Sequence, residues 1–217
     1  MGASFNHDYY DERFNPLGPL PKAESKVSKE TTPGLYAQYT YKLGDKLTVM
    51  PGVRWDHSDR YGSFVTPRLH IKYSPSKIVT LRTSIGKGYR SPHALAENVT
   101  LLASGREIVI DPDLKQEEAW NMGASLGFNI PLFGKNLELN AEYYYTDFKH
   151  QMIMNFDGAK GEHTLSFENL DGKSYSHTFQ VDATYALFSG MTTTAAFRLN
   201  DVKCTYDGVL RQKPLTS

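Results

Sequence analysis

The chain has 217 residues, with 24 Lys and Arg against 24 Asp and Glu, so its formal net charge at pH 7 is zero. This balance excludes the strongly basic surface typical of nucleic-acid-binding proteins, and a single cysteine, Cys204, excludes an internal disulfide. No run of about 18 apolar residues occurs, so the sequence predicts no transmembrane helix.

Apolar residues alternate with polar residues at period two along most of the chain, which is the pattern of a strand with one apolar face. A weaker strand is expected over residues 3–10. Eight stronger apolar sets follow, beginning at Leu35, Leu47, Val65, Val79, Trp120, Leu137, Phe179 and Met191. Helical faces need offsets of three and four, and these sets do not have them. The sequence therefore predicts about nine antiparallel strands.

The predicted strands are long enough to cross a membrane. They exceed the roughly 5 to 6 residues usual in globular proteins and reach the roughly 9 to 11 residues that a tilted strand needs to span a bilayer. Aromatic residues stand at the ends of several apolar sets, at Tyr41, Trp55, Tyr73 and Trp120. Such positions are typical of the aromatic girdles of transmembrane barrels, so we expect the apolar sets to face lipid.

The connections between these strands alternate in length. Tight turns are expected at 44–45, 74–76, 133–134 and 189–190, and longer or polar loops at 11–32, 58–62, 91–116 and 157–163. Consecutive antiparallel strands place every second connection on the same side, so the short turns share one end. This asymmetry is typical of bacterial outer-membrane barrels.

The predicted fold class is therefore all-β, an antiparallel up-and-down transmembrane β-barrel. A closed single-chain barrel has an even number of strands, and the first residues show no signal peptide. We therefore expect a partial barrel of about nine strands that depends on further sequence for closure.

Four segments resemble, in order, the barrel of TonB-dependent outer-membrane receptors. They are residues 86–92, 111–117, 143–153 and 167–181. The second resembles the family's NPDLKPE-like segment, with Asp111 and Gln116 in place of the usual Asn and Pro. In the fourth, Thr178 and Gln180 stand where the family usually has Gly and Glu.

The resemblance implies that residues 1–217 are part of a larger barrel domain filled by a plug, with the plug domain absent from this sequence. It implies a bacterial outer-membrane receptor that takes up a scarce ligand, such as an iron chelate or cobalamin, with energy supplied through TonB. The implied partners are outer-membrane lipid, a small-molecule ligand, TonB and the plug. No cofactor, nucleic acid or enzymatic activity is expected.

Charged residues on the polar side of the strands are expected to face the lumen or the plug. They are Arg54, Arg68, Arg82, Glu138, Glu142, Asp182 and Arg198. Salt bridges with one another and plug contacts are their expected role. For an anionic ligand the candidates are Arg90, His93 and Arg106, on or beside the loop 91–116, where Pro92 is expected to start a short helix. The alternative is a packed loop with solvated charges.

Two other functions remain open at this point. A soluble β-sandwich, acting as a binding or adhesin module, would also show period-two alternation. An outer-membrane enzyme would need a convergent Ser, His and acid. Asp56, His57 and Ser58 are adjacent on a strand, so their side chains alternate in direction and cannot converge. No catalytic or metal-binding motif is present.

Overall fold

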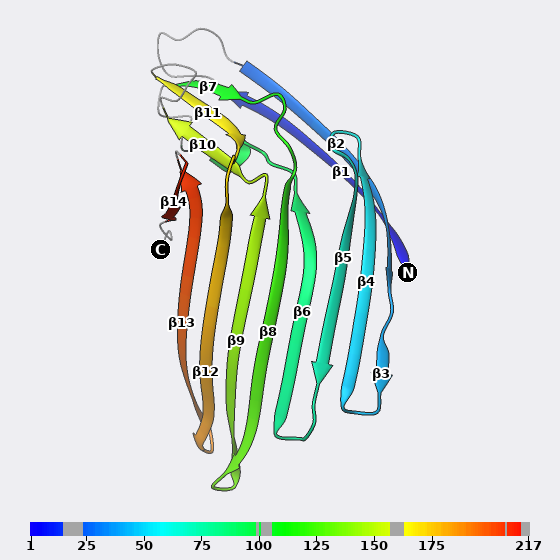
Figure 1. The fold of residues 1–217 in the computed structure, drawn as a ribbon, viewed down its shortest axis with the longest axis vertical. Helices are drawn as coiled ribbons and strands as arrows, with labels where there is room; N and C mark the ends of the chain where they lie inside the picture. The colour runs from blue at the N-terminus through cyan, green and yellow to red at the C-terminus, as the bar shows by residue number, and fades with distance from the viewer. Residues whose placement is uncertain (15–23, 99, 101–105, 157–162, 207, 214–217) are drawn as a thin grey trace.

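A computed structural model describes residues 1–14, 24–98, 100, 106–156, 163–206 and 208–213. Its main feature is one long, curved antiparallel sheet (Figure 1). The long strands are β1 (Gly2–Phe14), β2 (Glu24–Gln38), β4 (Leu47–Ser58), β5 (Gly62–Tyr73), β6 (Val79–Arg90), β8 (Glu117–Leu132), β9 (Lys135–Lys149), β12 (Ser174–Phe188) and β13 (Met191–Tyr206). These match the nine predicted strands.

Two short strands extend the same sheet. β3 (Tyr41–Leu43) pairs with β4, and β14 (Val209–Gln212) pairs with β13. The sheet order is β1-β2-β4-β5-β6-β8-β9-β12-β13-β14, so long strands that follow each other in sequence are neighbours in space. In the described part of the chain, β1 and β14 are the two edges and do not pair with each other. The predicted partial, open barrel wall is confirmed.

The turns and loops segregate as the sequence predicts. In Figure 1 the turns after β3, β5, β8 and β12 lie at the lower end, which we call the turn end, and the connections after β1, β4, β6 and β9 lie at the upper end, the loop end. The predicted loop at 58–62 is instead a short turn, because β4 continues to Ser58 and β5 begins at Gly62. The β8–β9 turn has positive φ at both Phe133 (48°) and Gly134 (75°). Two such residues give a hairpin turn that matches the right-handed twist of the flanking strands.

The predicted loop at 11–32 is wrong over most of its length. β1 continues to Phe14 and β2 begins at Glu24, and the two strands pair in register from Gly2 with Tyr36 to Phe14 with Glu24. Polar residues in this hairpin hide the strand pattern, because beyond the end of β4 neither face lies on an apolar surface. Residues 15–23 lie outside the described residues.

Register divides the sheet into an apolar and a polar face. Val79, Phe128, Leu139, Ala183 and Ala195 are directly opposite one another across five neighbouring strands. Directly opposed residues point to the same face, so the apolar sets form one continuous surface.

The apolar face is open rather than covered by a second sheet. Leu35 is 57% exposed, Val181 37% and Phe197 62%. A sandwich would bury these side chains, so the alternative of a soluble β-sandwich is wrong for the described residues.

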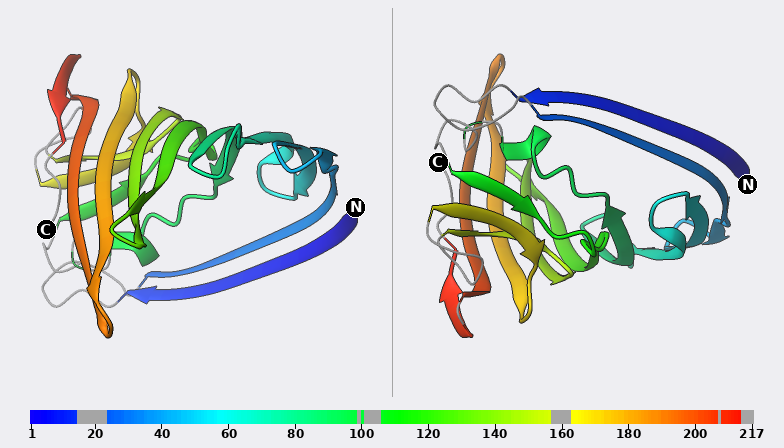
Figure 2. Two further views of the ribbon diagram at one scale, coloured as in Figure 1. Left: turned by 90° about the horizontal axis from the view of Figure 1, so that it is seen from below. Right: turned by 90° about the horizontal axis from the view of Figure 1, so that it is seen from above.

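A second, three-stranded sheet lies at the loop end. It contains β7 (Glu107–Ile110), β10 (Met152–Phe156) and β11 (Thr164–Asn169), with β11 in the centre, antiparallel to β10 and parallel to β7. Figure 2 shows it beside the ends of β9 and β12, whereas the β1–β2 hairpin forms the opposite edge of the curved sheet. Its apolar core contains Leu165 and Phe167, which are fully buried, and Ala94.

The predicted helix after Pro92 is present only as short turns. Glu97 N donates to the His93 carbonyl over 3.0 Å, and the described residues 96–98 and 100 are in 3-10 conformation. The rest of the predicted loop 91–116 is not all irregular, because it contains β7. Of the predicted loop 157–163, residues 157–162 lie outside the described part of the chain. No helix among the described residues is both long and apolar enough to cross a membrane.

Candidate functional site

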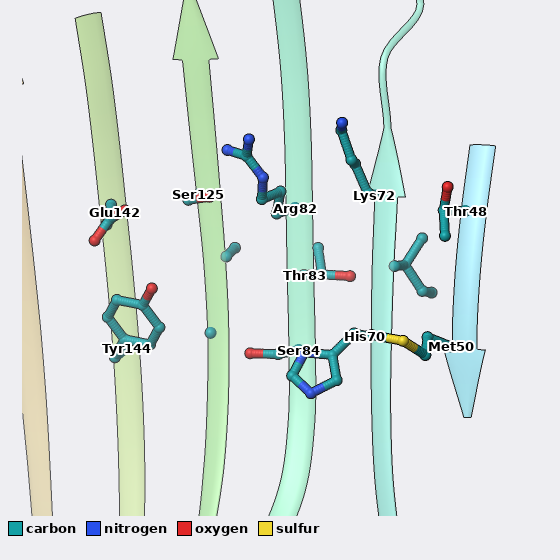
Figure 3. A pocket seen from close by; sticks show the side chains of 13 residues that line it. Thr48, Met50, His70, Lys72, Arg82, Thr83, Ser84, Ser125, Glu142 and Tyr144 are labelled. Carbon is teal, nitrogen blue, oxygen red and sulfur yellow. The ribbon is translucent and has the colours of Figure 1, made fainter. Parts of the chain in front are cut away.

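The polar face of the long sheet carries a shallow groove of about 480 Å³ (Figure 3). Its two sides differ in charge. His70 and Lys72 on β5 and Arg82 on β6 line one side, whereas Glu142 on β9 lines the other. β8 runs between them and contributes small residues such as Ser125. The groove can therefore accept a polar segment that carries both signs of charge.

A glycine on β8 allows an aromatic ring to cover part of this groove. Gly123 lies directly opposite Tyr144, and a Cβ on Gly123 would stand 2.5 Å from the Tyr144 ring. Any larger residue at position 123 would have to displace the ring. The Tyr144 ring can therefore occupy this position on the polar face because Gly123 has no side chain.

All seven residues predicted to face the lumen lie on this polar face by register. Arg54, for example, is opposite Thr66, and Arg198 is opposite Gln180. Several pair with polar neighbours on the same face, since Asn140 donates to Asp182 over 2.9 Å. The full set is Arg54, Arg68, Arg82, Glu138, Glu142, Asp182 and Arg198. Their contact with a plug stays a prediction.

One of these residues anchors the edge hairpin. The Arg54 guanidinium donates to both carboxylate oxygens of Asp56, at 2.6 and 2.7 Å, and to Ser4 Oγ on β1 at 2.7 Å. The Asp56 side chain is fully buried. Gly34 on β2 lies directly opposite Asp56, and a Cβ there would overlap the carboxylate. The arginine–aspartate pair thus fixes β1 and β2 against β4.

At the loop end, the segment 91–116 is closed at its base by residues that we call the loop neck: Arg90, Ser91, Gln116 and Glu117. Arg90 Nε donates to Glu117 Oε2 over 2.5 Å, and Gln116 Nε2 donates to Ser91 Oγ over 3.3 Å. Residues before and after the loop are therefore joined in two adjacent pairs.

The loop neck is also attached to its surroundings on two sides. Ser91 Oγ donates to Glu30 Oε1 on β2 over 3.0 Å. Glu30 Oε1 also accepts a hydrogen bond from Ser58 Oγ over 2.7 Å. On the other side, Met152 N on β10 donates to Glu117 Oε1 over 2.7 Å. Glu30 is only 4% exposed. A buried carboxylate is costly unless hydrogen-bonded, so these contacts hold the hairpin, the loop and the small sheet together.

Asn169 adds a further link between the two loop segments. Its Oδ1 accepts from Lys115 N over 2.6 Å, and its Nδ2 donates to the His150 carbonyl over 2.7 Å.

In the β4–β5 turn, burial raises the pKa of Tyr61, and the charge of Arg60 opposes this shift. The Tyr61 hydroxyl has no hydrogen-bond partner among the described residues.

The three predicted ligand residues are only partly brought together. Arg90 and His93 both contact Glu97, through an ion pair of 3.2 Å and a backbone hydrogen bond of 3.2 Å. The His93 ring also lies 4.2 Å from the ring of Tyr10. Arg106 lies just before β7, with its guanidinium 5.5 Å from the centroid of Phe156 on β10. Ligand binding by these three residues stays a prediction.

Sequence reasoning missed the residues that organise this end. Glu30, Glu117 and Asn169 carry the contacts between segments, but none of them was predicted as a site residue. The family-like segments 111–117 and 167–181 were the available signal, because they contain Glu117 and Asn169, whereas Glu30 lies in the predicted loop 11–32. Among the described residues, no cluster of His, Cys, Asp or Glu could hold a metal ion.

Comparisons with known proteins agree with this architecture. The family model described as "TonB dependent receptor-like, beta-barrel" matches residues 1–217. The iron-regulated outer membrane virulence protein of Vibrio cholerae serotype O1 is 25% identical over 114 residues, which is 52% of this chain. The ferric enterobactin receptor of Pseudomonas aeruginosa is 29% identical over 89 residues, or 41% of this chain.

Solved structures show the same fold. The crystal structure of the siderophore receptor PirA from Pseudomonas aeruginosa matches with a TM-score of 0.70 and 15% identity, and covers 93% of this chain and 41% of that one. The two sequence matches span 17% and 12% of those relatives' own lengths. This chain thus corresponds to a part of the proteins it resembles.

Proposed function

Because this chain belongs to the family of TonB-dependent receptor β-barrels of the bacterial outer membrane, we propose that it supplies part of the wall and loop end of a receptor that imports a scarce ligand. The proposed ligand is an iron chelate, since the similar proteins are named as iron-regulated or as ferric enterobactin receptors. The proposed energy source is TonB, acting through a plug inside the barrel.

The observation that supports this function most directly is the contrast between the two ends of the sheet. The turn end consists of tight hairpins, whereas the loop end carries a packed second sheet attached by the loop neck. Loops that are held by buried contacts can present side chains at fixed positions. The loop end is therefore suited to ligand recognition outside the cell.

Within the loop end, the proposed ligand contacts are Arg90, His93 and Arg106. Arg106 and His93 lie at the two ends of the same loop. A guanidinium group and an imidazole ring can both donate hydrogen bonds to an anionic chelate. Arg90 already contacts two carboxylates, Glu97 and Glu117. A ligand that binds Arg90 must compete with them, so we expect Arg90 to contribute less than the other two.

The groove on the polar face is the proposed plug contact. Its basic side on β5 and β6 and its acidic side at Glu142 favour a plug segment with acidic residues toward the first and basic residues toward the second. The similar proteins from Pseudomonas aeruginosa are named as receptors, and we propose no enzymatic activity for this chain.

The test uses the full-length receptor that contains this chain, expressed in iron-limited cells. Binding and uptake of a radioactive ferric chelate are compared for the parent, for the double variant His93→Ala with Arg106→Ala, and for Lys46→Ala in the turn at the opposite end. We expect binding to weaken by at least about ten-fold in the double variant, because even one charge-assisted contact is worth on the order of 1.5–3 kcal/mol. We expect no change for Lys46→Ala.

Energy coupling is tested separately by deleting TonB. Binding should persist while uptake stops. Unchanged binding in the double variant would reject the ligand contacts, and unchanged uptake without TonB would reject the proposed energy source.

A further inference from the structure

The apolar face of the wall ends at a definite level on the loop side. On β12 and β13 the last apolar pair is Phe179 with Leu199, and the next pair on the same face is His177 with Asp201. The change from apolar to polar therefore occurs within one step of two residues on both strands.

The same change occurs further toward the loops on the strands earlier in the sheet. On β6 and β8, Ile85 and Met122 are the last apolar pair, and Lys87 with Trp120 comes next. Ile85 and Met122 lie in the same row of directly opposed residues as Tyr145 and His177. The apolar face therefore reaches at least one residue pair higher here than on β12.

On β4 and β5 the apolar face extends further still. Its last pair is Trp55 with Val65, and His57 with Ser63 follows. A boundary that moves steadily along neighbouring strands is what tilted strands give when they cross a flat plane. We take this plane to be the loop-side boundary of the hydrocarbon.

Aromatic side chains gather at this boundary. Tyr143 Oη and His177 Nδ1 are 2.7 Å apart, and the His177 ring lies 4.9 Å from the Tyr145 ring and 5.2 Å from the Tyr175 ring. Amphipathic rings prefer the level of the lipid headgroups. The cluster independently places the boundary on β9 and β12.

Paired charges stand directly beyond it on the same face. Lys149 Nζ lies 3.0 Å from Asp147 Oδ2, and Lys203 Nζ lies 3.3 Å from Asp201 Oδ2. The Lys149 and Lys203 side chains are 56% and 38% exposed. Lys87 on β6, paired with Glu118, belongs to the same level.

We propose that Lys149 and Lys203, flanked by Lys87, bind the phosphate groups of lipid headgroups in the surrounding leaflet. An ammonium group has three donors, so a lysine that contacts one carboxylate oxygen retains donors for a phosphate. A lipid whose acyl chains cover the apolar face below brings its phosphate to this level, which raises the local concentration far above that of free phosphate. Exposed, carboxylate-paired lysines are unsuited to hold free phosphate without this anchor.

The experiment measures lipid retention by the full-length receptor that contains this chain, purified in detergent and supplied with phosphatidylglycerol or with phosphatidylcholine. Mass spectrometry of the intact protein counts the bound lipids. The test variant is Lys149→Gln with Lys203→Gln. The control is Lys72→Gln with Lys115→Gln, which removes the same charge from the polar face and from the loop 91–116 rather than from the outer face at this boundary.

We expect the test variant to lower the affinity for phosphatidylglycerol about five-fold or more, since one lysine near an anionic surface changes binding by about that factor. The control variant should not change lipid retention. Retention of phosphatidylcholine should fall less than that of phosphatidylglycerol, because its choline group neutralises its own phosphate. A third variant, Asp147→Asn with Asp201→Asn, should increase phosphatidylglycerol retention because it removes the competing carboxylates.

Three results would overturn the proposal. The first is equal phosphatidylglycerol retention in the test variant and the parent, and the second is an equal loss in the control. The third is displacement of the lipid by inorganic phosphate at an equal concentration, which would indicate a free-phosphate site. None of these results bears on ligand uptake, so the proposed receptor function is tested independently.

Discussion

The long sheet, which we call the wall, and the loop end differ in where they place their apolar side chains. The long sheet keeps its apolar side chains on the outside, with Phe197 62% and Leu199 58% exposed. The buried side chains of the described residues instead gather at the loop end: Glu30, Thr32, Asp56, Ser58, Ala94, Leu114, Gln116, Glu117, Thr164, Leu165, Ser166, Phe167, Ser174 and Cys204.

This difference follows from the solvent that each region meets. A wall in hydrocarbon needs every backbone group paired and gains from apolar groups that point outward. A loop region in water needs an apolar core of its own and hydrogen-bonded buried polar groups. The same substitution should therefore have different consequences in the two regions.

Truncation of a large apolar side chain should distinguish the regions most strongly. Phe167→Ala removes a fully buried ring from the small sheet, and such changes cost about 3–5 kcal/mol. We expect backbone amides of β7, β10 and β11 to lose hydrogen-exchange protection in the full-length receptor. Phe197→Ala on the wall should leave that protection unchanged. Equal protection in both variants would contradict a separate core at the loop end.

A charge introduced on the wall should have the next largest effect. Val181→Arg places a guanidinium on the apolar face, where a charge near the bilayer midplane costs about 2–4 kcal/mol. Thr184→Arg adds the same charge on the polar face of the same strand. We expect only the first to lower the free energy of folding into lipid vesicles, measured by denaturant titration. Similar losses would show that both faces meet water.

Weakening the buried carboxylate should have a smaller, local effect. Glu30→Gln retains the shape but replaces a charged acceptor of three hydroxyl groups, those of Thr32, Ser58 and Ser91. Losing charge-assisted hydrogen bonds of this kind costs about 1–3 kcal/mol. Faster hydrogen exchange should appear in residues 91–98, while the wall stays protected.

The matched control for this prediction is Asp113→Asn, an exposed carboxylate in the same loop. It should change exchange little. If both variants behave alike, Glu30 does not hold the loop neck.

The wall could be predicted from the sequence because its environment repeats every second residue. Leu139 and Val181 face outward and Asn140 and Asp182 inward, and this pattern is local to each strand. The turns at 133–134 and 189–190 follow from the same local signals. The edge hairpin could not be predicted in full, because its polar residues beyond β4 show no alternation of apolar and polar side chains.

The loop end could not be predicted because its contacts join distant residues. Ser91 meets Glu30 from 61 positions away, and Lys115 meets Asn169 from 54 positions away. The strands β7, β10 and β11 have 4, 5 and 6 residues, too few for a clear period. Of the candidate ligand residues, Arg90 ends β6 and His93 lies in the loop that follows, as expected from the sequence, whereas the carboxylates that surround Arg90 were not foreseen.

The central claim is that hydrocarbon covers one face of the wall. Spin labels at Leu139 and Val181, compared with labels at Asn140 and Asp182, test it most directly in the full-length receptor in vesicles. We expect the first pair to collide mainly with oxygen dissolved in lipid and the second pair with a water-soluble relaxation agent. The reverse pattern, or equal access for all four, would contradict it.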